Sequence, residues 1–208
     1  AFEKAGIIKK GIPVVIGEVL PETKSVFEEK ASREHSPIYF AEEQFTVKSV
    51  YAAGHKMKVT VNQSLCFASG LTGEYQTKNI ATVLAAVKEL NKLSFDITNE
   101  ALYNGLEYVT EITDLKGRWQ ILRNQPTTVA DTAHNVAGIE YICAQLQKQT
   151  YKTLRVVIGM VNDKDVSKVL GLLPSEAVYY FCQAGIARAM EVAELADNAQ
   201  KAGLQGNI

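Results

Sequence analysis

The sequence predicts an α/β protein built in two parts, and three observations support this. Short apolar runs rich in β-branched residues alternate with segments whose apolar residues recur at helical spacing. From about residue 116, strand-like and helix-like segments alternate with short links, which is the pattern of βαβ units around a parallel sheet. The 208 residues are 47% hydrophobic and 22% charged, which favours a globular chain with a sizeable core. We place the boundary near Leu115–Gly117, between domains at residues 1–115 and 116–208.

The first domain is expected to begin with a buried strand and a helix. Residues 12–17 are short, apolar and β-branched, which indicates the strand. Residues 21–33 indicate the helix, because Pro21 suits its first turn. Residues 37–62 indicate several short strands, with a turn at Ala53-Gly54-His55.

Two further helices are expected before the boundary. Residues 78–93 form the clearer one, because apolar side chains recur there on one helix face. These side chains are Ile80, Val83, Leu84, Val87 and Leu90. The other helix is expected over about 98–109, with Thr98 or Asn99 as its cap.

The second domain is expected to contain three strand–helix pairs. The strands are predicted at 127–131, 153–160 and 177–183, and the helices at 135–149, 165–173 and 188–203. In the last helix Val192, Leu195, Ala196 and Ala199 share a face. We expect no strand after this helix, which leaves one edge of a three-stranded sheet open.

Composition argues against several classes of function. The net charge is −1 and Lys and Arg are dispersed, so no basic stripe favours nucleic acid or anionic lipid as a partner. No apolar run approaches the ~18 residues that cross a membrane, and residues 1–10 do not resemble a signal peptide. Cys66, Cys143 and Cys182 lack a CxxC spacing and have apolar neighbours. We therefore expect buried core thiols in a reducing cytoplasm, and neither a disulfide framework nor a zinc site.

Polar residues follow each predicted strand of the second domain. In an open parallel sheet, ligands bind outside the C-terminal ends of the strands. The segments at these ends are Asp131–Asn135, Gly159–Asp165 and Gln183–Arg188. They place carboxylate, imidazole and amide groups beside helix N-termini, which attract anions. A purely structural interpretation stays open, in which Asn135 and Asp165 cap helices, Asp131 caps a turn and His134 lies in an exposed loop.

Five short segments, in the same order, resemble those of the folylpolyglutamate synthase and dihydrofolate synthase family. They are EKAGI at 3–7, GEYQTKN at 73–79, GRW at 117–119, DTAHN at 131–135, and IGM with DKD at 158–160 and 163–165. One such motif would be weak, but five collinear motifs are specific. The Mur ligases of cell-wall synthesis are wider relatives of that family. The resemblance implies ATP-dependent ligation, in which a carboxylate is phosphorylated and the amine of L-glutamate then displaces phosphate.

The resemblance also implies roles for matching residues. Lys4 matches a lysine that the family carbamylates with CO2, which gives an anionic oxygen ligand for Mg²⁺. Arg118 matches an arginine that reaches the ATP phosphates, a task that suits a planar guanidinium. Asn79 matches a residue beside the adenine, and Asp131 and His134 match residues that contact the nucleotide. We thus expect catalytic roles for Lys4, Arg118 and His134, and nucleotide binding by Asn79, Arg118, Asp131 and His134.

Other polar residues receive no role from the resemblance. Asp163, Lys164 and Arg188 match segments near the cleft, and His35 and His55 lie in the strand region without a family motif. The implied ligands are ATP, Mg²⁺ with K⁺ as a further candidate, the Lys4 carbamate, L-glutamate, and folate or dihydropteroate. Neither nucleic acid nor membrane is an expected partner.

The sequence departs from the family in one large respect, because it contains no match to GxxxxGK[ST]. The family places that loop, its metal-binding glutamate and histidine and its pterin surface upstream of EKAGI. The resemblance therefore implies that residues 1–115 are the remainder of a P-loop-type central ATPase domain. Residues 116–208 would be a Rossmann-like glutamate ligase domain that stops before the family's closing strand and helix. We expect this chain to be inactive without the N-terminal ATPase segment.

Two alternatives stay open. One is a Mur-type ligase that acts on a peptidoglycan precursor, which an upstream UDP-sugar domain would favour. The other is a non-catalytic α/β interaction module, which would bind a partner without nucleotide. EKAGI and GRW favour the folate enzymes over both.

Overall fold

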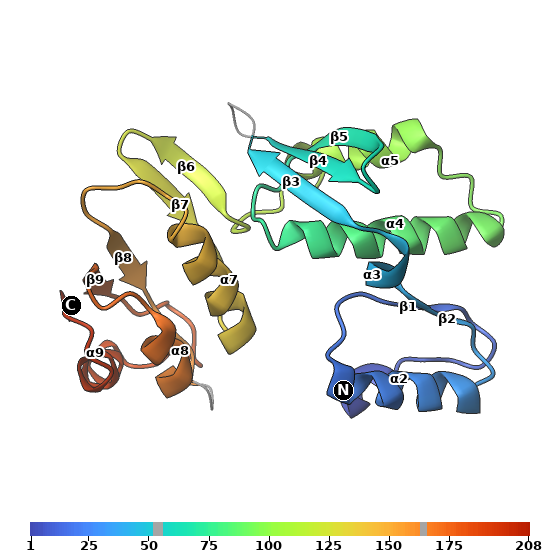
Figure 1. The fold of residues 1–208 in the computed structure, drawn as a ribbon. Helices are drawn as coiled ribbons and strands as arrows, with labels where there is room; N and C mark the ends of the chain where they lie inside the picture. Colours follow the sequence, from blue (N-terminus) through green and yellow to red (C-terminus); the bar gives the residue numbers. More distant parts are fainter. Residues whose placement is uncertain (52–55, 163–165) are drawn as a thin grey trace. The chain divides into compact units, whose positions relative to one another are not determined.

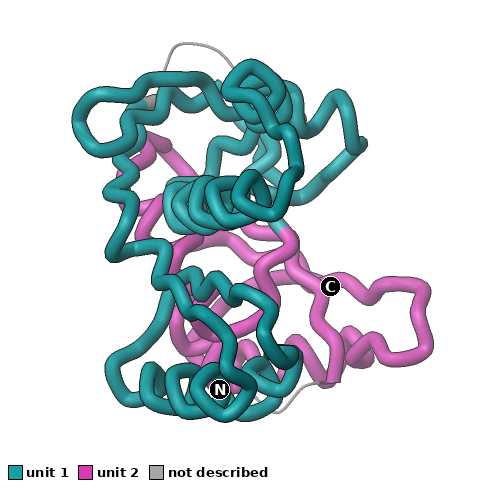
Figure 2. Tube along the Cα trace, turned by 90° about the vertical axis from the view of Figure 1, so that its right-hand side faces the viewer, with its two compact units in different colours: residues 1–131 teal, residues 132–208 magenta. Residues whose placement is uncertain are grey.

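A computed structural model describes residues 1–51, 56–162 and 166–208. The chain forms two compact units, Ala1–Asp131 and Thr132–Ile208 (Figure 2). The predicted turn at Ala53-Gly54-His55 lies outside the described residues, as do Asp163, Lys164 and Asp165.

The first unit opens with a parallel strand pair joined through a helix (Figure 1). Its elements are α1 (Phe2–Ala5), β1 (Val14–Ile16), α2 (Pro21–Arg33), β2 (Ile38–Phe40) and α3 (Ala41–Gln44). The helix predicted over 21–33 is confirmed at both ends, with proline as its first residue. Val14 pairs with Ile38 and Ile16 with Phe40, so the two strands are in register over their full length.

An antiparallel sheet packs with helices in the core of this unit. The strands are β3 (Val47–Tyr51), β4 (Met57–Val61) and β5 (Leu65–Ser69), and the helices are α4 (Gln76–Lys92), α5 (Asn99–Glu107) and the short α6 (Val109–Thr113). The side chains of β4 alternate between the core and the opposite face of the sheet, as expected for a strand. The buried ones, Met57, Val59 and Val61, pack against Ile80 and Leu84 of α4. Figure 1 shows α4 running along this sheet.

A β-hairpin ends the first unit and corrects one expectation. We expected residues 127–131 to belong to the parallel sheet, but β7 (Thr127–Ala130) pairs antiparallel with β6 (Gln120–Asn124). Asn124 pairs with Thr127, so only Gln125 and Pro126 connect the strands. So short a connection folds the chain back onto the strand it has just left.

In the described residues, the second unit is a three-stranded parallel sheet with three helices. Its elements are α7 (Val136–Leu146), β8 (Arg155–Ile158), α8 (Val166–Leu172), β9 (Val178–Phe181), α9 (Val192–Lys201) and β10 (Gly206–Asn207). The strand order is β10-β9-β8, and both pairings are parallel. Fully buried side chains of all layers meet in one core, among them Leu170, Tyr179 and Leu195.

Strand β10 contradicts the expectation that no strand follows the last helix. It is two residues long and pairs with Tyr179 and Tyr180 of β9. Gly206 makes this possible, because a Cβ there would lie 2.4 Å from the carbonyl oxygen of Tyr179. A glycine-containing strand of two residues carries no hydrophobic alternation, so the sequence pattern could not reveal it.

The cysteines are a second correction, because none is fully buried. Cys66 and Cys182 are exposed, Cys143 is half-buried, and all three are free thiols. Cys66 lies on β5 at a position where the alternation of strand side chains turns it away from the core. Among the helices of the described residues, none is both long and apolar enough to cross a membrane.

Candidate functional site

The backbone of the Gly117–Trp119 turn is left-handed on both sides of Arg118. Gly117 has φ +70° and Trp119 has φ +48°, a left-handed conformation that costs a non-glycine residue about 1–2 kcal/mol. The Trp119 side chain is 5% exposed. Its backbone N–H donates to Asp131 Oδ2 at 2.6 Å, and its carbonyl accepts a hydrogen bond of 3.1 Å from the Thr72 hydroxyl. Two side chains thus stabilise the strained residue.

Tyr75 joins this network from the loop that precedes α4. Its hydroxyl donates to the same Asp131 oxygen at 2.9 Å. Burial raises the pKa of the Tyr75 hydroxyl well above its usual value, and the Asp131 charge adds to that shift. The phenol therefore remains a protonated donor throughout the neutral range.

Arg118 lies between the two left-handed residues and is half-buried. Its Nη1 donates to the Gly117 carbonyl at 3.2 Å. Arg118 also lines a hollow of about 380 Å³ beside Thr72 and the strand β6. A guanidinium carries a fixed positive charge and five N–H donors, which suits contact with an anion.

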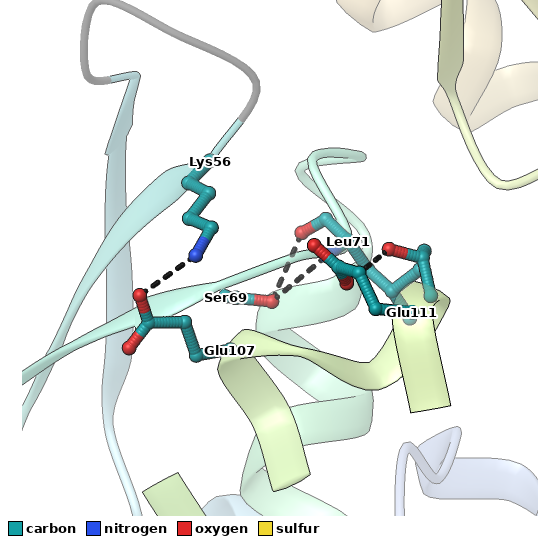
Figure 3. A network of polar contacts seen from close by, with 6 residues as sticks. Lys56, Ser69, Leu71, Glu107 and Glu111 are labelled. Carbon is teal, nitrogen blue, oxygen red and sulfur yellow. Dashed lines mark hydrogen bonds and ion pairs between the residues drawn. The ribbon is translucent and has the colours of Figure 1, made fainter. Parts of the chain in front are cut away.

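Lys56 and Leu71 also line this hollow, and Figure 3 shows the polar contacts that they make. Lys56 Nζ forms an ion pair of 2.8 Å with Glu107 and lies 4.0 Å from the centre of the Tyr108 ring. The hydrogen bond that Lys56 donates to the Glu107 carboxylate raises the pKa of Lys56. Ser69 Oγ accepts from the Leu71 N–H at 3.2 Å, which fixes the chain where β5 ends.

Asn79 lies in the first turn of α4 and is exposed. Its side chain donates to Gln76 Oε1 at 2.8 Å. Its neighbour Lys78 pairs with Glu18, just after β1, and a Cβ on Gly17 would lie 2.6 Å from the Thr82 hydroxyl. The start of α4 is therefore held close to the end of β1.

Lys4 is exposed on the four-residue helix α1, and His35 is exposed too. Within the described ranges no group of three or more His, Cys, Asp or Glu side chains could hold a metal ion. A carbamate forms on a neutral amine, which burial favours. The structure does not bury Lys4, so the carbamate on Lys4 stays a prediction from the sequence motif.

The remaining predicted residues lie in the second unit. His134 is exposed, with Nδ1 3.1 Å from the Thr132 carbonyl oxygen. Asn135 caps α7, because its side-chain oxygen accepts from the Gly138 N–H at 2.8 Å, as the structural interpretation predicted. Arg188 is exposed.

The structure thus joins some of the predicted residues and adds two. Arg118 and Asp131 share one network, which Tyr75 connects to the loop before the helix of Asn79. Sequence reasoning missed Tyr75 and Thr72. Tyr75 lies inside the GEYQTKN segment, four residues before Asn79, and that position was the available signal.

Comparison with known proteins gives a family match for the second half of the chain. Residues 117–208 match the family model for the Mur ligase glutamate ligase domain. This match includes the β6–β7 hairpin, which packs with the first compact unit.

Curated relatives extend the likeness to most of the chain. The dihydrofolate synthase/folylpolyglutamate synthase of Bacillus subtilis is 30% identical over 185 residues, which cover 85% of this chain and 42% of that protein. The folylpolyglutamate synthase of Lacticaseibacillus casei is 28% identical over 197 residues, covering 91% and 45%. The chain therefore spans less than half the length of these relatives.

Solved structures show the same fold. The folylpolyglutamate synthase of Mycobacterium tuberculosis, complexed with ADP and AMPPCP, aligns with a TM-score of 0.82 at 24% identity and covers 99% of this chain and 49% of that one. The Thermotoga maritima folylpolyglutamate synthase aligns with a TM-score of 0.70 at 25% identity, covering 100% and 49%. The chain is thus similar to folylpolyglutamate and dihydrofolate synthases over most of its length, and its residues 117–208 match the family model for the Mur ligase glutamate ligase domain.

Proposed function

We propose that this chain forms part of an ATP-dependent ligase that joins L-glutamate to a folate, either tetrahydrofolate or dihydropteroate. The network that holds Arg118 between Gly117 and Trp119 supports this most directly, since it presents a guanidinium at a polar hollow. The names of the curated relatives favour a folate substrate. The Mur ligase match alone would fit a peptidoglycan precursor equally well.

The proposed reaction activates a carboxylate before it forms the amide. The γ-phosphoryl group of ATP passes to the substrate carboxylate, giving an acyl phosphate and ADP. The glutamate amine attacks the acyl carbon, and the tetrahedral intermediate expels phosphate and leaves an amide. Arg118 would offset charge on the transferring phosphoryl group, as cationic side chains do in phosphoryl transfer.

The other roles follow from the sequence motifs. Asn79 would contact the adenine, and Asp131 and His134 would contact the nucleotide from the segment that follows β7. Mg²⁺, when bound, would neutralise phosphate charge, and its affinity would come largely from the phosphates themselves. The Lys4 carbamate and a part for K⁺ stay predictions, as does a cytoplasmic location, with which three free thiols are compatible.

The test is ATP-dependent transfer of labelled L-glutamate to dihydropteroate and, separately, to tetrahydrofolate by the full-length gene product. Arg118→Ala should lower the rate at least a hundredfold, the scale seen when a transition-state donor is removed. Arg33→Ala is the matched control, because Arg33 is exposed on α2 in a surface pair with Glu29.

Each outcome has a consequence. Incorporation that collapses in Arg118→Ala, but not in Arg33→Ala, would support the ligase and identify the preferred folate. Residues 1–208 alone should give no incorporation. Failure with both pterins would overturn the folate assignment and redirect the test to UDP-linked cell-wall precursors.

A further inference from the structure

Tyr75 is held in place by its own loop as well as by its hydroxyl. The ring lies against Gly73, where a Cβ would come within 2.5 Å of the Tyr75 Cε1 atom. The hydroxyl reaches Asp131 Oδ2 at 2.9 Å, across 56 residues of sequence. A glycine at 73 thus allows the ring to approach the backbone closely enough to direct the phenol toward Asp131.

Asp131 connects Tyr75 to the Gly117–Trp119 turn through one carboxylate oxygen. The oxygen that accepts from Tyr75 also accepts from the Trp119 N–H at 2.6 Å. Trp119 has φ +48°, and such a residue persists only when its surroundings stabilise it. The Thr72 hydroxyl holds the Trp119 carbonyl from the other side at 3.1 Å. The bond from Thr72 to Trp119 and the bond from Tyr75 to Asp131 therefore both come from one loop, residues 72–75.

The conformation of the turn decides where Arg118 points. Arg118 is flanked by Gly117 at φ +70° and Trp119 at φ +48°, so relaxing either residue would swing the Arg118 Cα–Cβ bond. We propose that Tyr75 is a positioning residue for Arg118, which acts by holding Asp131 and, through it, the left-handed backbone of Trp119. This inference rests on the proposed function as far as Arg118 acts on phosphate.

A spectroscopic test addresses the turn directly. Trp119 is the single tryptophan of the 208 residues, and it is buried. In residues 1–208, Tyr75→Phe should raise acrylamide quenching of Trp119 fluorescence about twofold, the change that would accompany partial release of the turn. Tyr103→Phe is the matched control, since Tyr103 is a half-buried tyrosine of the same unit whose ring stacks on Phe67 at 5.2 Å.

A kinetic test separates positioning from simple stabilisation. In the full-length gene product, Tyr75→Phe should lower kcat/KM for ATP about tenfold, the loss expected for one hydrogen bond to a charged acceptor. In an Arg118→Ala background the same change should cost less than about twofold, because the residue that Tyr75 positions is gone. Tyr103→Phe should have no effect in either background.

Two results would overturn the inference. One is Trp119 quenching that stays the same in Tyr75→Phe as in the wild type. The other is an equal loss of kcat/KM with and without Arg118, which would mean that Tyr75 acts independently. If the wild type ligates no glutamate, the proposed function fails together with the Arg118 step. The quenching result then still decides, by itself, whether Tyr75 holds the Trp119 turn.

Discussion

Trp119 shows how a single residue can be stabilised in an unfavourable conformation. It is large, buried and left-handed, and its backbone N–H and carbonyl are both bonded to side chains. A buried carbonyl that loses its donor costs about 1–3 kcal/mol, so we expect the Thr72 hydroxyl to contribute measurably to the free energy of unfolding.

Thr72→Val should therefore destabilise the first unit by about 1–2 kcal/mol, because valine keeps the shape and removes the donor to the Trp119 carbonyl. Urea unfolding followed by Trp119 fluorescence measures this. Thr128→Val, on the exposed strand β7, should change stability by less than about 0.5 kcal/mol. Equal effects of the two substitutions would contradict the assigned role of Thr72.

Tyr75 makes stability depend on pH. Its pKa is raised in the folded chain, so folding favours the protonated phenol. That contribution is complete below the unfolded pKa of about 10 and is lost as pH rises above it. The urea midpoint of the wild type should fall between about pH 9 and 11 more steeply than that of Tyr75→Phe. Tyr179, whose pKa burial also raises, affects both proteins alike. Identical slopes would count against the assigned Tyr75 environment.

At the scale of elements, hydrophobic periodicity predicted helices whose buried face follows a regular repeat. The helix over 21–33 and the face of α9 with Leu195 and Ala199 are confirmed. The face of α4 is only partly right, because Val83 is 38% exposed and the small residues Ala81 and Ala85 are buried instead. Alanines are buried where a neighbouring element approaches closely, here α3 through Ala41, and a hydrophobicity pattern does not record that approach.

The candidate site was predictable only where residues lie close in sequence. Arg118 and Asp131 were named from motifs, but their connection through Trp119 depends on a positive φ that no pattern reports for tryptophan. The bond from Tyr75 to Asp131 spans 56 positions, so no local rule could pair them. The hairpin β6–β7 was missed because the strand–helix alternation that follows favoured a parallel sheet for residues 127–131. The connection between its strands, Gln125 and Pro126, is only two residues long.

Strand β10 offers a test at this scale. Gly206→Ala should break its pairing, because a Cβ would clash with the Tyr179 carbonyl at 2.4 Å. We expect a loss of about 1–2 kcal/mol and faster hydrogen exchange at the Tyr179 amide, which donates to the Gln205 carbonyl. Gly171→Ala is the matched control, since a Cβ there meets nothing within 4 Å on helix α8 and alanine favours helix. Unchanged exchange in Gly206→Ala would contradict the pairing.

At the scale of the whole molecule, the family match and the compact units place the domain boundary at different residues. The family match begins at residue 117, close to the division proposed from the sequence, whereas compactness divides the chain after Asp131. The difference is the hairpin of residues 117–131, whose base is bonded to Thr72 and Tyr75 of the first unit. In the 208-residue chain this segment is therefore held by contacts that lie outside the matched domain.

A fragment of residues 117–208 should consequently lose the burial of Trp119 even if its own sheet folds. Thr72 and Tyr75 are missing from that fragment, so the left-handed turn has lost two of the side chains that stabilise it. We expect red-shifted Trp119 emission and stronger acrylamide quenching than in residues 1–208, together with retained far-UV circular dichroism from α7, α8 and α9. Emission and quenching that match those of the whole chain would mean that the turn is intrinsic to the hairpin. In that case the boundary proposed at residues 115–117 would describe an autonomous domain, and Tyr75 would be a neighbour of the turn without holding it.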